Sequence, residues 1–205
     1  PYMASVSNIT VTAGGAEVES DEHLAERVYL FPGSYSTAGP EDAYLYHAKK
    51  FNTSVGDAVA VSDQAAGTVD LYFLMTDGST PPQEMIQGLQ DYLRDGNIRP
   101  MTDLVTVAAP TETEYTISLT YYINRSDSNR AVSIQAEVLA AVDAYTKWQR
   151  AIGRDINPSK LVERIMAAGA KRVDLTAPVY TVVGKKSVAA LAGDPAVHYG
   201  GLEDD

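Results

Sequence analysis

The chain has 205 residues, of which 45% are hydrophobic and 21% are charged, and its formal net charge is −11. This composition is that of an ordinary globular protein and excludes a disordered or fibrous chain. The acidic balance excludes a protein that binds the phosphate backbone of nucleic acid, because that function needs a basic face. The chain contains no cysteine, which excludes disulfides, thiol nucleophiles and thiolate metal sites and is consistent with a reducing cytosol.

The first region, residues 1–66, is acidic and mostly helical in pattern. Residues 5–13 alternate as a short strand, and helices are predicted over 20–31 and 40–51 because each begins with a capping or proline residue followed by acidic residues. The apolar residues of the first helix share one face: Leu24, Val28 and Phe31. The start lacks an initiator methionine, a signal peptide and any apolar run of the ~20 residues that cross a bilayer, and we interpret the chain as a fragment or a processed product.

A first α/β unit is predicted over residues 67–113, after a strand at 55–61. The stretch 68–75 alternates as a strand, Pro81 and Pro82 open a helix that ends near residue 95, and a further strand begins at residue 104.

The bend before that last strand holds the first candidate residues. Pro100 moves Arg99 out of the helical region of backbone space, and Asp103 is near enough in sequence to form an ion pair or a turn contact with Arg99. The alternative is that Arg99 binds an anion or is catalytic. We interpret Arg99, Pro100 and Asp103 as a structural hinge.

A second α/β unit is predicted over residues 114–183, with residues 184–205 as a loose tail rich in glycine, alanine and aspartate. The unit is expected to contain, in order, a strand at 114–124, helices at 134–152 and 158–168, and short strands at 171–176 and 179–183. Tyr121, Tyr122 and Trp148 are candidates for core or interface positions, where aromatic residues are favoured. The whole pattern indicates an α+β protein, with a small helical N-terminal region followed by two strand–helix–strand units with mixed sheets.

No arrangement of residues indicates an active site. The three histidines His23, His47 and His198 are far apart in sequence, and neither a phosphate-binding loop nor a nucleophile elbow is present. The acidic cluster of Glu17, Glu19, Asp21 and Glu22 lacks the spacing of a calcium loop. We therefore expect a non-catalytic protein without a cofactor or metal.

Five stretches resemble the baseplate J-like family of contractile phage tails. They are GGAEVESDEHLAERV (14–28), STAGPEDAYLYHAKKF (36–51), GTVDLYFLM (67–75), IRPMTDLVTVAAP (98–110) and WQRAIGRDINPSKLVERIMAAGAKRVDL (148–175), together with the strand YTISLTYYI. The resemblance covers nearly the whole chain in the same order, without the usual N-terminal portion of the family, and it brings no catalytic residues.

The resemblance implies a structural subunit of the baseplate wedge in a phage, a prophage or a particle derived from a tail. The expected partners are other wedge and tail proteins, including neighbours like tail protein I and like the lysozyme-like wedge protein W. Several copies would form a ring, without nucleic acid or membrane as partner. The subunit would be assembled in the bacterial cytoplasm and located in the virion tail baseplate.

Two other classes of function remain open at this point. Paired strand–helix–strand units also occur in small-ligand-binding regulatory modules, which would show a pocket with convergent polar groups. A tail-associated hydrolase of cell-wall polymer would need two carboxylates that flank a cleft, and the spacing of the acidic residues selects no such pair.

Overall fold

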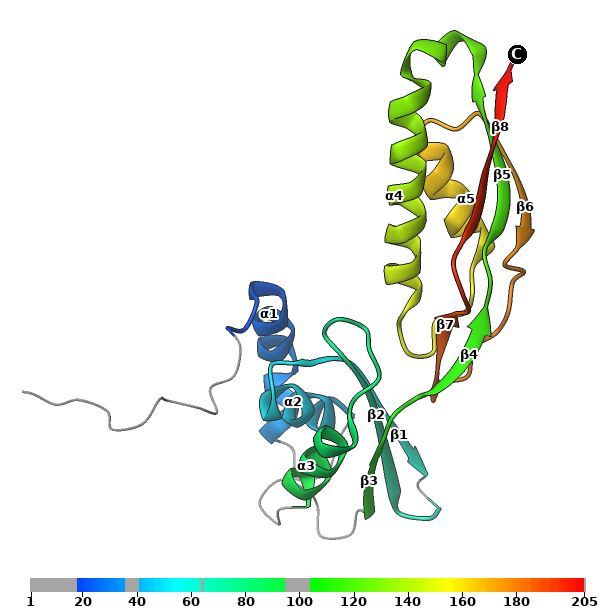
Figure 1. Ribbon diagram of the computed structural model, residues 1–205. Helices are drawn as coiled ribbons and strands as arrows, with labels where there is room; N and C mark the ends of the chain where they lie inside the picture. The colour runs from blue at the N-terminus through cyan, green and yellow to red at the C-terminus, as the bar shows by residue number, and fades with distance from the viewer. Residues whose placement is uncertain (1–17, 36–40, 64, 95–103, 205) are drawn as a thin grey trace, which may run out of the picture.

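A computed structural model of the chain describes residues 18–35, 41–63, 65–94 and 104–204. These residues form two units that lie end to end along the molecule (Figure 1). The first unit contains α1 (Asp21–Leu30), the 3₁₀ helix η1 (Phe31–Tyr35), α2 (Glu41–Phe51), β1 (Val55–Asp63), β2 (Thr68–Met75), α3 (Gln83–Leu93) and β3 (Leu104–Ala108). The second unit contains β4 (Thr111–Tyr115), β5 (Ser118–Asn124), the 3₁₀ helix η2 (Arg125–Arg130), α4 (Ala131–Gln149), α5 (Pro158–Ala167), β6 (Arg172–Ala177), β7 (Ser187–Leu191) and β8 (Ala196–Glu203).

The first unit is built on a mixed sheet in the order β1-β2-β3. β1 and β2 are antiparallel, whereas β2 and β3 are parallel and are connected through α3. The predicted alternation of β2 places Val69, Leu71 and Phe73 in the core. They pack with α2 and α3, so the expected boundary between residues 66 and 67 instead separates two strands of one sheet that share one core with the helical region. The predicted strand at 5–13 lies outside the described residues.

Helix α1 is held to the rest of the unit by polar contacts. Ser20 caps its N-terminus by accepting a hydrogen bond from the backbone N–H of His23 at 3.2 Å. The Glu19 carboxylate accepts two hydrogen bonds of 2.8 Å from Arg27 and contacts Nδ1 of His23 at 2.7 Å, while Nε2 of His23 lies 2.9 Å from the carbonyl oxygen of Val55. The hydrogen bonds from Arg27 and then His23 lower the pKa of Glu19 to about 2.

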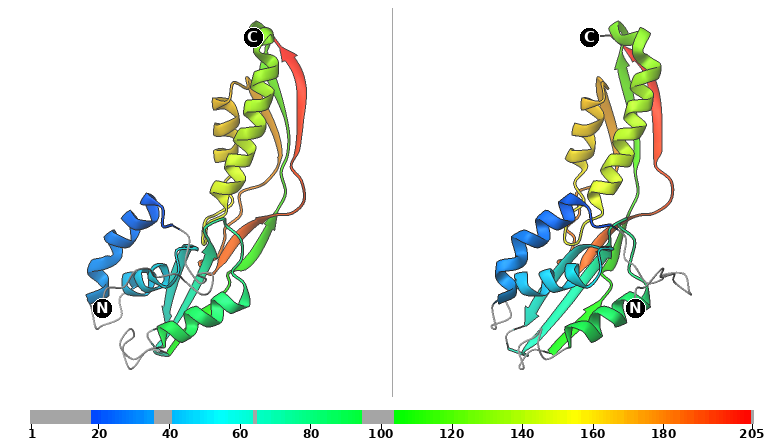
Figure 2. Two further views of the ribbon diagram at one scale, coloured as in Figure 1. Left: turned by 60° about the vertical axis from the view of Figure 1, so that its left-hand side comes forward. Right: turned by 90° about the vertical axis from the view of Figure 1, so that its left-hand side faces the viewer.

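The second unit has a three-stranded sheet in the order β6-β5-β8, with α4 and α5 on one face (Figure 2). β5 is antiparallel to β6 and parallel to β8. The inward residues of β5 are buried with one stripe of α4: Leu119, Tyr121, Ile123, Ile134, Val138, Val142 and Tyr145. Asn157 caps α5 through its side-chain oxygen, and α5 is followed by Gly169 with φ of +99°. The predicted α+β class with mixed sheets is confirmed.

Two expectations for the C-terminal part are wrong. Residues 184–205 are not a loose tail, because β7 pairs with β4 and β8 pairs with β5 over most of its length. The predicted strand at 179–183 is reduced to a single bridge between Thr181 and Ile156. The side chain of Asp155 accepts a hydrogen bond from the backbone N–H of Val183 at 2.9 Å. This backbone N–H therefore has a hydrogen-bond partner without a neighbouring strand.

Leu71→Ala should destabilise the protein by about 2–5 kcal/mol, because Leu71 is fully buried and the substitution leaves a cavity. Urea denaturation followed by circular dichroism measures this loss. Leu139→Ala, at a position that is 57% exposed, is the matched control and should change the free energy of unfolding by less than about 0.5 kcal/mol. Equal losses for the two variants would contradict the described core.

Glu19→Gln should lower the urea midpoint of the first unit above about pH 4.5, and this effect should become much smaller as the pH falls to about 2. The folded-state pKa of Glu19 is depressed, so its stabilisation is present above its ordinary pKa and is lost as the pH falls through the folded value. Glu22→Gln, on the exposed side of the same helix, is the control. A difference between wild type and Glu19→Gln that stays constant down to pH 2 would refute this account.

Candidate functional site: the junction between the two units

Within the described residues, the backbone passes between the two units at residues 109–110, where β3 leads into β4 (Figure 1). Pro110 is buried at this crossing. A single backbone connection would leave the angle between the units free unless side chains fixed it. The side chains around this crossing are therefore the candidate functional site of a structural protein.

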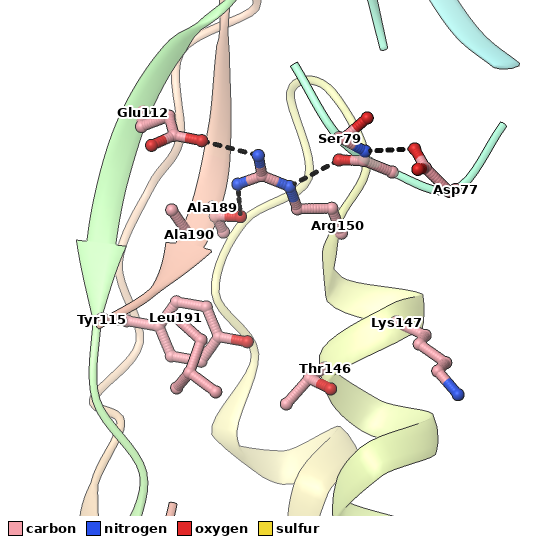
Figure 3. Close-up of a pocket in the computed structure, with 11 residues that line it drawn as sticks. Asp77, Ser79, Glu112, Tyr115, Thr146, Lys147, Arg150, Ala189, Ala190 and Leu191 are labelled. Atoms are coloured by element: carbon pink, nitrogen blue, oxygen red, sulfur yellow. Dashed lines mark hydrogen bonds and ion pairs between the residues drawn. The ribbon is translucent and has the colours of Figure 1, made fainter. Parts of the chain in front are cut away.

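Arg150 is the central side chain of the junction, directly after the end of α4. Its Nε donates a hydrogen bond of 2.8 Å to the carbonyl oxygen of Gly78 in the first unit. Its two terminal nitrogens bind the carboxylate of Glu112 on β4 at 2.6 Å and the carbonyl oxygen of Ala189 on β7 at 3.2 Å (Figure 3). The planar guanidinium thus joins both units and both strands of the β4–β7 pair, which a lysine could not do with one nitrogen.

The turn that meets Arg150 has a defined conformation. Gly78 has φ of +80°, and a Cβ atom at this position would lie 3.2 Å from Cγ of Arg150. The Asp77 side chain accepts a hydrogen bond of 2.8 Å from the backbone N–H of Ser79, and hydrogen bonds from Ser79 lower the pKa of Asp77. These contacts hold the turn so that the Gly78 carbonyl points to the guanidinium.

Two further contacts cross the junction. The backbone N–H of Ile152 donates a hydrogen bond of 2.7 Å to the Asp57 carboxylate on β1. Lys186 forms an ion pair of 2.7 Å with Asp70 on β2, and the hydrogen bond to Asp70 raises the pKa of Lys186. We call these two contacts and the Arg150–Gly78 hydrogen bond the junction contacts. They attach to the turn after β2, to β1 and to β2, so together they restrain rotation about the backbone crossing.

Open grooves surround the junction contacts. One groove of about 490 Å³ is lined by residues that include Glu112, Lys147 and Arg150, and a second of about 450 Å³ lies beside Ile152 and Lys185. Three of the four charged side chains that line the first groove are in ion pairs, because Arg150 binds Glu112 and Lys147 binds Asp143 on its own helix at 2.7 Å. The fourth, Asp77, accepts the hydrogen bond from the backbone N–H of Ser79. Over the described part of the chain, no group of three histidine, cysteine or acidic residues is placed to hold a metal ion. The described helices include none that is both long and apolar enough to cross a membrane.

The predicted candidate residues are located away from this junction or outside the described residues. Arg99, Pro100 and Asp103 are outside the described residues, so the hinge assigned to them stays a prediction. Tyr121 is 3% exposed and packs in the core of the second unit.

The other two aromatic candidates are half-buried. Tyr122 lies on the opposite face of β5, where the Arg172 guanidinium is 4.1 Å from its ring centroid. Trp148 packs against the core, and Arg154 stacks on its ring at 4.4 Å. These positions fit a structural role, and an interface role for Tyr122 and Trp148 stays a prediction.

Sequence reasoning missed the junction residues. The sequence patterns single out neither Arg150 nor the Asp77–Gly78 pair as functional residues. Arg150 and Gly78 are separated by 72 positions, and no local pattern connects them. One signal was available in the sequence. Arg150 directly follows a long helix that has no acidic residue one turn earlier to pair with it, which indicates a partner in another part of the chain.

Two family models match the chain. The Baseplate J-like central domain matches residues 36–109, and the Baseplate J-like protein C-terminal domain matches residues 115–193. The two matches correspond to the two units and meet at the backbone crossing. Together they cover most of the chain, which therefore belongs to the baseplate J-like family, as its sequence resemblance predicted.

The chain is also similar to a relative and to a solved structure. Baseplate protein J of Escherichia phage P2 is 26% identical over 195 residues, which are 95% of this chain and 64% of that protein. The chain thus spans about 64% of the length of this relative. The baseplate of the anti-feeding prophage, determined by cryo-electron microscopy with 6-fold symmetry, contains a chain that is similar with a TM-score of 0.49 and 10% identity, over 71% of this chain and 35% of that one.

Arg150→Ala should weaken the junction by about 1.5–3 kcal/mol, the range for hydrogen bonds to a charged group, while both cores stay folded. Hydrogen exchange should increase in the turn around Gly78 and in β7, and small-angle X-ray scattering should show a broader range of shapes. Arg150→Lys should show most of the same effect, because one nitrogen cannot replace the three contacts. Arg130→Ala, whose exposed partner Asp127 lies at 4.0 Å, is the control. Unchanged exchange around Gly78 in Arg150→Ala would contradict the assigned role of Arg150.

Proposed function

We propose that this chain is a structural, non-catalytic subunit of the baseplate wedge in the contractile tail of a phage or a prophage-derived particle. The observation that carries the proposal is the match of both units, in order, to the two baseplate J-like domains. The relative of phage P2 supports it, since the similarity extends over 95% of this chain.

The geometry supports a mechanical role. Each unit has its own hydrophobic core, and the two are joined by one backbone crossing and by three junction contacts that are polar. Polar contacts at a partly exposed junction keep a defined angle and can be exchanged for other contacts without disrupting either core. A wedge subunit needs such a shape, because it holds its neighbours in fixed positions until the sheath contracts.

The partners follow from this role. The subunit would pack with other wedge and tail proteins, including neighbours like tail protein I and like the lysozyme-like protein W, in several copies around the tail tube. Its assembly would take place in the bacterial cytoplasm, and its final location would be the tail baseplate. The acidic first unit would favour a basic neighbour, with charge determining register and association rate more than strength.

The competing interpretation is a small-ligand-binding module, and the groove beside Arg150 is the place for such a ligand. All three nitrogens of the Arg150 guanidinium donate hydrogen bonds within the chain. The groove is also open rather than enclosed. Such an arrangement is typical of a side chain that holds two parts of a protein together, whereas ligand sites are concave and offer unpaired polar groups. The structural role is therefore the better supported of the two.

Sedimentation of lysate from the source cells, after treatment that induces prophages, tests the proposal. With an antibody against this chain, we expect the signal in particles of megadalton size, and we expect label at the tail tip in electron micrographs. Recovery of the chain only in the light soluble fraction would reject the baseplate role and would direct the work to ligand screens.

A further inference from the structure

The attachment of helix α1 to the first unit depends on polar contacts. The buried residues of this helix are His23 and Leu30. Leu24 and Val28, which the sequence places on one face of the helix, are 43% and 62% exposed. Hydrophobic burial therefore contributes little to the attachment of α1, and the contacts of the buried His23 side chain become important.

Both ring nitrogens of His23 lie against hydrogen-bond acceptors. Nδ1 is 2.7 Å from the Glu19 carboxylate, and Nε2 is 2.9 Å from the carbonyl oxygen of Val55 at the start of β1. A backbone carbonyl has no proton to donate. The Glu19 carboxylate has none either, because hydrogen bonds from Arg27 and then His23 lower its pKa to about 2. The ring therefore donates both hydrogen bonds, which only the doubly protonated imidazolium can do.

A neutral His23 ring would lose one of these two contacts. Neutral imidazole donates from one nitrogen and has a lone pair on the other. That lone pair would face either the Val55 carbonyl oxygen or the Glu19 carboxylate, and both pairs of atoms repel each other. Because His23 is 8% exposed, water has little access to replace the lost hydrogen bond while α1 stays in place.

The ion pair beside His23 keeps its charges while histidine titrates. Glu19 accepts two hydrogen bonds of 2.8 Å from Arg27, and the hydrogen bond to Glu19 raises the pKa of Arg27. Histidine is the side chain whose ordinary change of charge falls between about pH 5 and 8. Glu19 and Arg27 stay charged through this range, so the proton on His23 is the one that changes at this contact.

Helix α2 contributes a second cation and a tyrosine to the surroundings of α1. Nζ of Lys49 donates hydrogen bonds of 2.7 Å to Glu26 on α1 and of 2.6 Å to the carbonyl oxygen of Gly56, the residue after Val55. The side chain of Tyr46 interacts with Arg27. These contacts do not require a proton on His23. We therefore expect a neutral His23 to loosen α1 and to leave α2 and the sheet folded.

We propose that His23 is a pH-dependent switch, whose imidazolium form holds α1 against the start of β1 and whose neutral form releases this contact. The inference does not depend on the proposed function, because all of its contacts lie within the first unit. The protonated ring gains its partners in the folded chain, so its stabilisation is present at low pH and is lost as the pH rises. The switch thus controls one helix and not the whole fold.

Two nuclear magnetic resonance measurements on the full chain test the switch. The first detects the ring protons of His23, whose signals are assigned by their loss in His23→Gln. At about pH 5 we expect a proton on both ring nitrogens. Both protons should exchange with water more slowly than those of the exposed His198.

The second measurement follows backbone amide protection, corrected for the intrinsic exchange rate at each pH, from about pH 5 to 8.5, which spans the titration of histidine. The protection of α1 should fall by about tenfold or more as the His23 ring loses a proton, since a hydrogen bond to a charged group is lost. The protection of β5 in the second unit should stay constant and serves as the internal reference.

The matched control is His198→Gln, because His198 is exposed on β8 in the second unit. This variant should keep the pH-dependent fall in α1 protection, whereas His23→Gln should give low protection of α1 at every pH. A single proton on the His23 ring at about pH 5 would overturn the proposal. Constant protection of α1 while the ring loses its proton would also overturn it, as would a pH dependence that persists in His23→Gln.

Discussion

The arrangement of the two units depends on one guanidinium group. Arg150 follows the end of α4, donates a hydrogen bond to the Gly78 carbonyl in the first unit, and binds Glu112 and Ala189 in the paired strands β4 and β7 of the second unit. Five N–H donors in one plane make this possible for arginine alone among the side chains. The hydrophobic cores stabilise each unit separately, so the angle between the units is determined by these polar contacts.

The separation between apolar cores, which stabilise each unit, and polar contacts, which define the angle between the units, fits a structural subunit of a baseplate. Apolar burial stabilises each unit without direction, whereas hydrogen bonds and ion pairs define a geometry and can be exchanged at small net free energy. Two units with separate hydrophobic cores, joined by polar contacts, fit a structural role.

Local signals in the sequence predicted most of the helices and strands. The features that were missed depend on contacts between residues far apart in the sequence. Asn157 begins α5 through its side-chain cap and Gly169 follows the end of α5 with a left-handed backbone, and both residue types are local signals that can be recognised in the sequence. β8 was missed because its partner β5 is more than seventy residues away and because its glycines suggest a loop; Gly200 is required by the Tyr122 ring, which lies 2.4 Å from where a Cβ atom would be. The stripe on α1 was predicted, but polar contacts of Glu19 and Lys49 determine which side of the helix is buried. The Arg150 site depends on three partners at distant positions, so no local pattern predicted it.

The distance between the two units in solution tests the central claim most directly. Spin labels on Asp91→Cys in α3 and Glu137→Cys in α4, both exposed positions on helices, report this distance by double electron–electron resonance. A single narrow distribution in the otherwise native chain, which broadens when Arg150 is replaced by alanine, is the predicted result. A broad distribution in the native chain would contradict the account, because it would mean that the junction contacts do not fix the angle between the units.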